Sequence, residues 1–368
     1  MTTGAKKLRD AYAIKKGAPV YMKEFGYYCL DRWIAEGHIR SAEDLRGPCG
    51  FDEPGAHYLH NLGGCEAPFV PAFDVEILED RGAYELVRDF AGRHVLYFKG
   101  RRNGFMPEYV GHPVKDRKTW EELCKWRMEP RNPRRIEMIG EALNAALPVA
   151  RSGLIISQYI VGGYMYLRSL IGPTELLFKF YDEPDLIHDC MEAWYNVADF
   201  VTSEYQRELA FDEILFDEDI CYNHGSLISP AMIKEFLFPY YTRLIANIKK
   251  RQKDARHVYV YVATDGYCPP VMPLYEKIGM DVMGPFEAAS NNDVVEIGRM
   301  YPNLVITGGM DKRVLAAGKD EIDRMVDRIM PVMKERGGYI PTCDHGVPEE
   351  VSFENFIHFR KRLLEYSG

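Results

Sequence analysis

The sequence predicts an α/β fold, a parallel (β/α) barrel of the TIM type with an antiparallel β excursion near its N-terminus. From about residue 136 onward, short runs of β-branched and aromatic residues alternate with longer helical patterns, as they do in parallel sheets. Several of these runs end in Asp or Glu, and parallel barrels keep their chemistry at the carboxyl ends of the strands. A chain of 368 residues has room for one such barrel with insertions.

Buried strands are predicted where such a run is followed directly by Gly, Pro or acidic residues. The clearest is 258–262, because Thr264-Asp265-Gly266 and a helix that opens on Pro269-Pro270 follow it. A doubly wound sheet would alternate in the same way, but no G-x-G-x-x-G follows any predicted strand, which excludes its nucleotide-binding form. Strands of barrel type are predicted at residues 19–25, 154–160, 214–216, 258–262, 281–286, 304–307 and 339–342. We expect an eighth strand that is short, distorted or hidden in the excursion.

The N-terminal part departs from the regular alternation. Residues 47–62 are rich in Gly, Pro and His and are predicted to form a loop. Residues 73–98 alternate apolar and polar side chains between two turn-like breaks, which is the spacing of an antiparallel meander. We expect this excursion to cap the site or to form a contact in a homodimer. The division is therefore 1–135 for the first strand and the excursion, and 136–368 for the main body of one continuous domain.

Helices are predicted between these strands from their periodicity and their start signals. Ser229-Pro230 is a strong start, an N-cap hydroxyl followed by Pro at the first helical position. Pro239 lies inside the same helix and is expected to kink it. The predicted helices cover residues 116–126, 136–147, 185–209, 229–253, 269–279, 291–300 and 319–336, with others starting at 174 and 352.

Composition excludes several classes of function. The net charge is -9 and no long basic run is present, so nucleic-acid binding is not expected. No apolar run approaches the ~20 residues of a membrane span, and the basic N-terminal segment lacks an apolar export signal, so we expect a cytoplasmic protein. Eight scattered cysteines without a C-x-x-C pair argue against a disulfide framework and against a zinc ribbon.

The loops after parallel strands gather on one face, so the residues at the strand ends are expected to share a pocket. Several carboxylates and one imidazole in a pocket either raise one another's pKa values or share a cation. One imidazole with two or three carboxylate oxygens would suit a divalent metal such as zinc. The residues expected in this pocket are Glu24, Gln158, Asp217, Glu218, Asp219, Asp265, Glu287, Asp311, Asp344 and His345.

Each of these residues also has an ordinary structural explanation. Asp265 and Gly266 are favoured in turns for backbone reasons, and Glu218 is of a type that commonly solvates a surface loop. His345 could hydrogen-bond a backbone carbonyl through either ring nitrogen. The functional hypothesis depends on their shared position at the same end of different strands.

Six short motifs, taken in order, resemble those of the uroporphyrinogen decarboxylase superfamily. They are Thr-Asp-Gly (264–266), Pro-Phe-Glu (285–287), Gly-Gly-Met-Asp-Lys (308–312), Gly-Gly-Tyr-Ile-Pro (337–341), Asp-His-Gly-Val-Pro (344–348) and Val-Ser-Phe-Glu-Asn-Phe (351–356). The resemblance covers the chain from about residue 136 to its end and, more loosely, its start. It implies a distorted (β/α)8 barrel and proteins that are often dimeric.

The superfamily that this chain resembles holds two chemistries. True decarboxylases carry an Arg-rich segment after the first strand that grips the carboxylates of a tetrapyrrole, whereas MKEFGYYCLDRW here has a Glu and two Tyr at that place. A highly anionic substrate needs cationic partners, so the sequence argues against haem-pathway decarboxylation. The other branch comprises corrinoid-dependent methyltransferases, which resemble zinc enzymes and pass a methyl group between a small substrate and a corrinoid on a partner protein.

The resemblance also implies site residues, with one departure. Thiol-using methyltransferases carry His-x-Cys after the strand that matches 258–262, and this chain has Ala263 and Asp265 there. Glu287 falls where some members place an acidic residue near the metal, and His345 falls at or beside their last Cys. The expected zinc ligands are therefore Glu218, Asp265, Glu287 and His345, and the expected catalytic residues are Glu218, Asp265 and His345. The expected substrate-binding residues are Glu24, Tyr28, Gln158, Tyr222 and Tyr267.

The hypothesis that follows is the methyltransferase component of an O-demethylase. It would move a methyl group from a small methoxylated, aromatic compound to the Co(I) form of a corrinoid protein. An ether oxygen is a poor leaving group, so it must be protonated or bound by a Lewis acid as the methyl group departs. Two alternatives stay open: a lyase that decarboxylates a smaller acid, and a barrel that binds a corrinoid or tetrapyrrole without catalysis.

Overall fold

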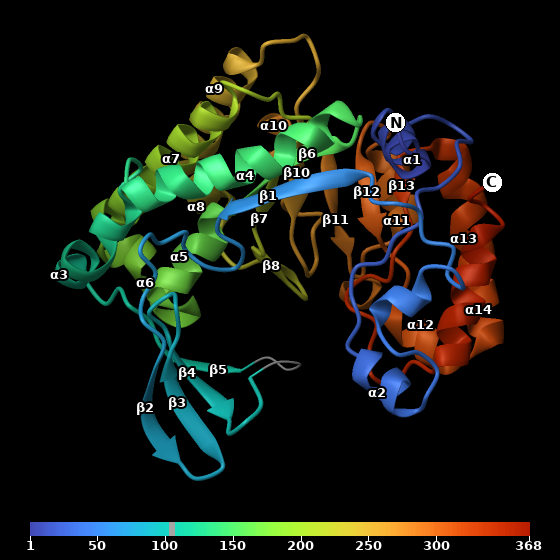
Figure 1. Ribbon diagram of the computed structural model, residues 1–368, viewed down its shortest axis with the longest axis horizontal. Helices are drawn as coiled ribbons and strands as arrows, with labels where there is room; N and C mark the ends of the chain where they lie inside the picture. The colour runs from blue at the N-terminus through green and yellow to red at the C-terminus, as the bar shows by residue number, and fades with distance from the viewer. Residues whose placement is uncertain (103–106) are drawn as a thin grey trace.

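The centre of the protein is a seven-stranded parallel sheet whose order is β1-β6-β7-β10-β11-β12-β13 (Figure 1). The computed structural model describes residues 1–102 and 107–368. Neighbouring strands follow one another along the chain and each pair is parallel, which is the winding of a TIM-type fold. The strands are β1 (Ala56–Leu62), β6 (Ile155–Val161), β7 (Glu213–Asp217), β10 (Tyr259–Ala263), β11 (Val282–Phe286), β12 (Val305–Gly308) and β13 (Tyr339–Ile340).

Helices cover the outer surface of this sheet. In Figure 1, α4, α7 and α9 lie over the first strands, while α13 and α14 lie beside the last ones. The helices are α1 (Thr3–Tyr12), α2 (Leu30–Ala35), α3 (Arg117–Thr119), α4 (Pro133–Arg151), α5 (Gly163–Ile171), α6 (Pro173–Asp182), α7 (Pro184–Tyr205), α8 (Pro230–Met232), α9 (Phe238–Arg251), α10 (Met272–Lys277), α11 (Val294–Met300), α12 (Lys312–Ala317), α13 (Lys319–Arg336) and α14 (Phe353–Leu364). No helix in the described ranges combines the length and the apolar character needed to cross a bilayer.

The side chains of the strands point alternately to the two faces of the sheet and contribute to two hydrophobic clusters. Leu215 on β7 packs into an inner cluster with Tyr261 and with Tyr12 of α1, which lies against the inner side of the sheet. Ile214 and Phe216 on the same strand pack into the larger outer cluster beneath the helices. Because successive side chains of a strand point to opposite faces, the odd-numbered residues of β7 face inward and the even-numbered ones face the helices.

The prediction of a first strand at residues 19–25 was wrong. This segment belongs to no strand, and β1 lies instead within 47–62, where a loop was predicted. Met22 exchanges hydrogen bonds with Asp52, before β1, while the Glu24 carboxylate accepts one from the Cys343 amide, after β13. The segment therefore spans the gap between the two edge strands partly through side chains, and no continuous ladder joins β1 to β13 in the described chain.

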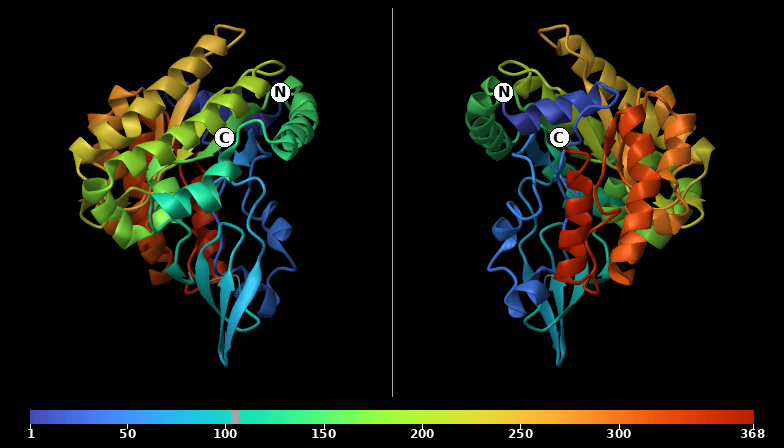
Figure 2. Two further views of the ribbon diagram at one scale, coloured as in Figure 1. Left: turned by 90° about the vertical axis from the view of Figure 1, so that its left-hand side faces the viewer. Right: turned by 90° about the vertical axis from the view of Figure 1, so that its right-hand side faces the viewer.

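The predicted antiparallel excursion is confirmed. It forms a separate sheet with the order β2-β3-β4-β5, and it projects from the parallel sheet and its helices as a tongue (Figures 1 and 2). Since it follows β1 in the chain, it starts from the carboxyl end of that strand. Arg93 anchors it by pairing with Asp89 at 2.7 Å and with Glu66, in the loop after β1, at 2.9 Å. Its strands are β2 (Glu76–Arg81), β3 (Tyr84–Arg88), β4 (His94–Phe98) and β5 (Glu108–Gly111).

The helix predicted over 229–253 forms with an interruption. Ser229 caps α8 by accepting a hydrogen bond from the Met232 amide, as its sequence indicated. A π-helical turn at Ile233–Leu237 then separates α8 from α9. Pro239 has no amide hydrogen to donate into the preceding turn, which explains why the regular ladder breaks there.

Candidate functional site

The loops after β10 and β13 bring an acid and an imidazole together. His345 Nε2 lies 3.5 Å from Asp265 Oδ2, and His345 Nδ1 lies 3.3 Å from the Tyr28 hydroxyl. The hydrogen bond to Asp265 raises the pKa of His345 above its usual value, although partial burial and the charge of Lys312 work against this. The arrangement favours a protonated imidazole, which donates to both partners.

Two aromatic rings flank His345. The Phe25 ring centroid is 5.0 Å from that of His345, and the Tyr28 ring is stacked at 5.8 Å with an interplanar angle of 17°. Phe25 is 51% exposed and Tyr28 is 52% exposed, so neither ring is buried in the hydrophobic core. Exposed rings beside a polar group offer flat apolar walls for a ligand ring.

A second charge pair lies beside the first. Lys312 Nζ is 2.7 Å from Glu287 Oε1, and Glu287 Oε2 accepts a hydrogen bond from the Gly266 amide at 3.0 Å. Burial alone would raise the pKa of Glu287, but these contacts outweigh it and lower the pKa. Glu287 is therefore ionised, and Lys312 balances its charge. Its second oxygen holds the Gly266 turn in place.

Asp344 connects three of the loops. Its fully buried carboxyl accepts hydrogen bonds from the Ala288 amide at 2.9 Å and from the Lys312 amide at 3.1 Å. Burial raises the pKa of Asp344 to about 6, partly offset by the charge of Lys312. Its position orders the loops that carry Glu287, Lys312 and His345 at once.

Asp217, the last residue of β7, faces inward with Leu215. Asp217 Oδ2 accepts a hydrogen bond from the Tyr159 hydroxyl at 2.5 Å and a longer one from Cys65 Sγ at 3.7 Å. Burial and the nearby charges of Asp219 and Asp265 raise its pKa to about 6. Asp217 was predicted at the strand end without a role; alternation puts it and Glu218 on opposite sides, but packing sets which of the two faces inward.

Glu218 does not join the other predicted ligands. It faces the helices, where Oε1 accepts a hydrogen bond from the Tyr164 amide at 3.0 Å and Oε2 accepts one from the Tyr241 hydroxyl. The carboxyl is fully buried, and burial raises its pKa to about 7. Its hydrogen bonds connect the loop after β7 to the start of α5 and to α9, which is a structural position.

The predicted substrate-binding residues divide into two groups. Glu24 is buried in an ion pair with Arg360 at 3.2 Å, and Gln158, also buried, donates hydrogen bonds to backbone carbonyls. Neither is placed to contact a ligand in the mouth, which is the region at the carboxyl ends of the parallel strands where Asp265 and His345 lie. Tyr28 is at the site, and Tyr222 and Tyr267 lie together near the Asp265 loop, where the Tyr267 amide donates to the Tyr222 carbonyl at 2.8 Å.

The side chains present do not fit the predicted zinc ion. Glu218, directly after β7, is bound to α5 and α9 rather than to the Asp265–His345 pair, and the ammonium of Lys312 already neutralises Glu287. Among the described residues, no group of three or more His, Cys, Asp and Glu side chains is arranged to hold a metal.

Three further residues of the site had no role predicted from the sequence: Lys312, Asp344 and Phe25. Lys312 directly follows Asp311 in the Gly-Gly-Met-Asp-Lys motif, and Phe25 follows Glu24 in the extended segment. The motif could have drawn attention to Lys312. Phe25 had no such signal, because its exposure beside His345 depends on how residues 19–25 lie between the edge strands.

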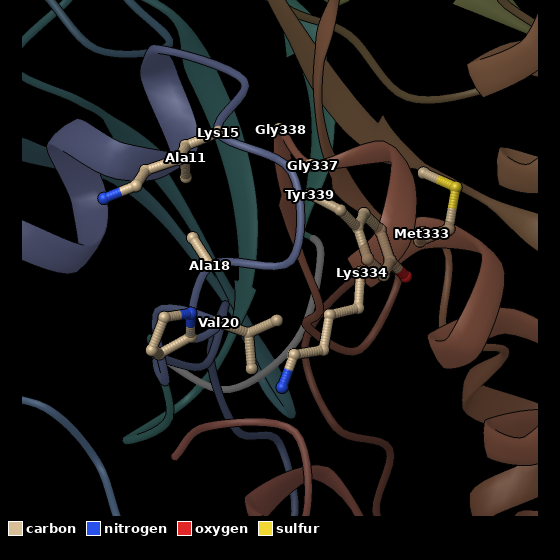
Figure 3. A pocket seen from close by; sticks show the side chains of 10 residues that line it. Ala11, Lys15, Ala18, Val20, Met333, Lys334, Gly337, Gly338 and Tyr339 are labelled. Carbon is tan, nitrogen blue, oxygen red and sulfur yellow. The ribbon is translucent and has the colours of Figure 1, made fainter.

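A separate small cavity lies at the other end of β13. It has a volume of about 10 Å³ and lies between α1, the end of α13 and Tyr339 (Figure 3). That volume holds about one water molecule. The cavity is thus too small for a substrate, and it lies at the amino-terminal end of the strand rather than at the mouth.

Comparison with known proteins places this site in context. The sequence profile of the family described as Uroporphyrinogen decarboxylase (URO-D) matches residues 105–366. The uroporphyrinogen decarboxylase of Geobacter metallireducens is 28% identical over 134 residues, which is 36% of this chain and 37% of that protein. The chloroplastic one of Zea mays is 22% identical over 238 residues, 61% of this chain and 56% of that protein. The match to the bacterial relative thus spans little more than a third of its length.

A solved structure extends the comparison to the whole chain. A methyltransferase from Methanosarcina mazei aligns with 100% of both chains at a TM-score of 0.62 and 14% sequence identity. At that identity the likeness is one of fold.

Proposed function

This chain belongs to the uroporphyrinogen decarboxylase family, and from that premise we propose that it is the methyltransferase component of a corrinoid-dependent O-demethylation system. The methyl donor is a small methoxylated aromatic compound, and the acceptor is the Co(I) form of a corrinoid on a partner protein. The observation that carries the proposal is His345, whose imidazole is held by Asp265 and flanked by two half-exposed aromatic rings.

The rings of Phe25 and Tyr28 account for the class of substrate. A methoxyarene stacking on either ring places its ether oxygen within reach of the imidazole, and offset or edge-on ring pairs contribute about 0.5–1.5 kcal/mol beyond area burial. Highly anionic substrates fit this site poorly, because the acids Asp217 and Asp265 lie there and the ammonium of Lys312 is already paired with Glu287.

Proton donation by His345 is the chemical step that this chain supplies. As the methyl carbon–oxygen bond breaks, its electron pair stays on the oxygen, which takes the Nδ1 proton of His345 in place of the Tyr28 hydroxyl and leaves as a neutral phenol. The acceptor supplies the two-electron nucleophile that takes the methyl group. Asp265 stabilises the imidazolium beforehand and keeps the ring oriented, as the carboxylate partner of a catalytic histidine does.

Lys312, Glu287 and Asp344 act on the same step indirectly. Glu287 fixes the Gly266 amide next to Asp265, and Asp344 fixes the backbone of Lys312. These contacts determine the position of Asp265 relative to His345. Lys312, Glu287 and Asp344 are therefore positioning residues rather than groups that touch the substrate.

The test measures both products of the transfer. The purified protein is incubated with a panel of methoxyarenes and cob(I)alamin under reducing conditions, and methylcobalamin and the free phenol are quantified. We expect them in equal amounts, and His345→Gln is expected to lower the rate about 10²-fold or more. Release of CO₂ from an aromatic acid without methyl transfer would contradict the proposal.

One observation favours the lyase alternative. Lys23, next to Glu24 in the extended segment 19–25, makes no ion pair with any described residue. Burial lowers its pKa, partly offset by the charges of Glu213 and Glu24. An unpaired ammonium in the barrel suits a carboxylate substrate, so CO₂ release from 4-methoxybenzoate is the readout that separates this second function from the first.

A further inference from the structure

We propose that Asp217 selects the methyl donor, by accepting a hydrogen bond from a hydroxyl or amino substituent on its ring and by rejecting a carboxylate at that position. This inference rests on the proposed function, because it names a further feature of the same substrate. Three observations support it: the position of Asp217, the different surroundings of its two carboxylate oxygens, and the charges around it.

The position of Asp217 follows from the register of the sheet. Asp217 lies opposite Val161 on β6 and opposite Ala263 on β10. Its side chain points to the inner face, where the half-buried Tyr159 also packs against the inner cluster. Asp265, which pairs with His345, follows Ala263 by two residues, and its charge acts on Asp217.

The two carboxylate oxygens of Asp217 have different surroundings. Both intramolecular donors, the Tyr159 hydroxyl at 2.5 Å and Cys65 Sγ at 3.7 Å, approach Oδ2. Oδ1 has no hydrogen-bond partner within the described chain, and it is not among the buried atoms that lack one, so it faces accessible space. Tyr159 thus orients the carboxylate with one oxygen held and the other available to a ligand.

The charges around Asp217 explain which ligand it would take. Asp217 makes no ion pair with a described residue, while Asp219 is neutralised by Arg168 and Asp265 lies next to His345. Burial together with the charges of Asp219 and Asp265 raises the pKa of Asp217 to about 6, so the carboxylate is mostly ionised at neutral pH. An ionised acceptor binds a neutral donor and repels a second carboxylate.

Asp217→Asn should reverse this preference rather than merely weaken it. The Tyr159 hydroxyl needs an acceptor, so the amide oxygen is expected to take the place of Oδ2 and the amide NH₂ the place of Oδ1. The group that faces the substrate then changes from an acceptor to a donor. A purely structural role for Asp217 would not produce such an inversion.

The experiment measures binding by calorimetry, without the acceptor. Each methoxyphenol isomer is compared with its own methyl ether and with the methoxybenzoate of the same geometry. For the wild-type protein the phenol is expected to bind about tenfold more tightly than the ether, and the benzoate most weakly, since one hydrogen bond to a charged group has about that value. In Asp217→Asn the benzoate should bind more tightly than the phenol.

Two further variants keep the test decisive. Asp217→Ser removes the charge and is expected to reduce the phenol-to-ether ratio to below about threefold, without inversion, and it serves if the amide variant fails to fold. Asp254→Asn makes the same chemical change on the surface loop before β10, at the opposite end of the sheet, and should leave all ratios unchanged.

Each outcome bears on one proposal at a time. An unchanged order of ligands in Asp217→Asn and Asp217→Ser, or wild-type binding of the benzoate as tight as that of the phenol, overturns the inference even if methyl transfer occurs. The expected inversion without any methyl transfer to cob(I)alamin supports the inference and counts against the proposed function instead.

Discussion

The protonation state of His345 is the property on which the proposed chemistry depends at the scale of a single residue. The carboxylate of Asp265 stabilises the charged imidazole, and the raised pKa of His345 records that stabilisation. A group whose pKa is raised by folding contributes stability that is fully present below its ordinary pKa and is lost as pH rises through the raised pKa. The same titration removes the proton that the reaction needs.

Asp265→Asn is expected to shift the pH dependence of the reaction. Without the carboxylate the pKa of His345 falls, so the rate of methyl transfer should decline at a lower pH than in the wild type. The pH profile of kcat/KM and imidazole ¹⁵N chemical shifts measure this. Asp323→Asn, which affects the Asp323–His358 pair on α13 and α14, is the matched control and should leave the profile unchanged. Coinciding profiles for the wild type and Asp265→Asn would contradict the role of Asp265.

Glu218 provides a prediction about stability. Burial raises the pKa of Glu218 from 4.5 to about 7, so the folded state retains a proton that the unfolded chain releases. Its contribution to stability is complete below pH 4.5 and is lost as pH rises to about 7, an effect on the order of 3 kcal/mol. Glu218→Gln should therefore gain stability relative to the wild type between pH 4.5 and 8.

Urea unfolding at several pH values tests this for Glu218. Glu137→Gln, on the exposed face of α4, should show no such pH-dependent difference from the wild type. A constant difference between Glu218→Gln and the wild type across the range would mean that Glu218 is ionised in the folded protein.

At the scale of an element, the close approach of β11 and β12 shapes the mouth. Gly284 on β11 has no side chain, and a Cβ there would lie 2.1 Å from Thr307 Oγ1 and 2.6 Å from the Thr307 carbonyl oxygen on β12. The Thr307 hydroxyl also contacts the Tyr261 hydroxyl at 2.9 Å, on the inner face. A glycine at this position lets two strands and an inward-facing hydroxyl pair come together beneath the catalytic loops.

Gly284→Ala is expected to destabilise the protein by about 1–3 kcal/mol, because the added methyl group meets backbone as well as a side chain. Gly140→Ala on α4 is the matched control, since a Cβ there meets nothing within 4 Å. That control should instead stabilise the protein by about 0.5–1 kcal/mol through the unfolded state and helix propensity. Thermal unfolding of both variants measures the difference, and equal effects would contradict the packing argument.

At the scale of the whole molecule, the ion pairs of Arg93 help to attach the antiparallel tongue to the parallel sheet. Arg93 is buried and pairs with both Asp89 in the tongue and Glu66 in the loop after β1. The same loop carries Cys65, which contacts Asp217. The tongue is thus connected to Asp217 through Arg93, Glu66 and Cys65.

Arg93→Met should loosen the tongue and leave the buried carboxylate of Asp89 and the partly exposed carboxylate of Glu66 without a cationic partner, at a cost of about 3–5 kcal/mol. We expect faster proteolysis within residues 73–98 and a lower melting temperature. Arg81→Met is the control, because Arg81 pairs with Glu79 on the exposed surface and should change stability by less than about 1 kcal/mol. Unchanged proteolysis in Arg93→Met would show that apolar contacts alone hold the tongue.

Most of the elements could be predicted from the sequence, because their periodicity is local. Six of the seven predicted strands lie in the parallel sheet, and the antiparallel meander lies where its alternation indicated. The error at 19–25 has a physical cause, since Asp52 and Glu24 complete the hydrogen bonds of that segment with side chains. The pairing of His345 with Asp265 agrees with the prediction that strand-end residues meet.

The sequence by itself determined the type and order of the elements, the alternation of strands and the motifs that carry family membership, because these depend on local periodicity and residue identity. Only the tertiary structure decided which of two adjacent acids faces the mouth. Asp217 faces inward and Glu218 faces the helices, since a strand turns successive side chains to opposite sides and its orientation is set by packing on both faces. The contact of Lys312 with Glu287 likewise depends on how the loops after β11 and β12 fold together, which no local pattern encodes.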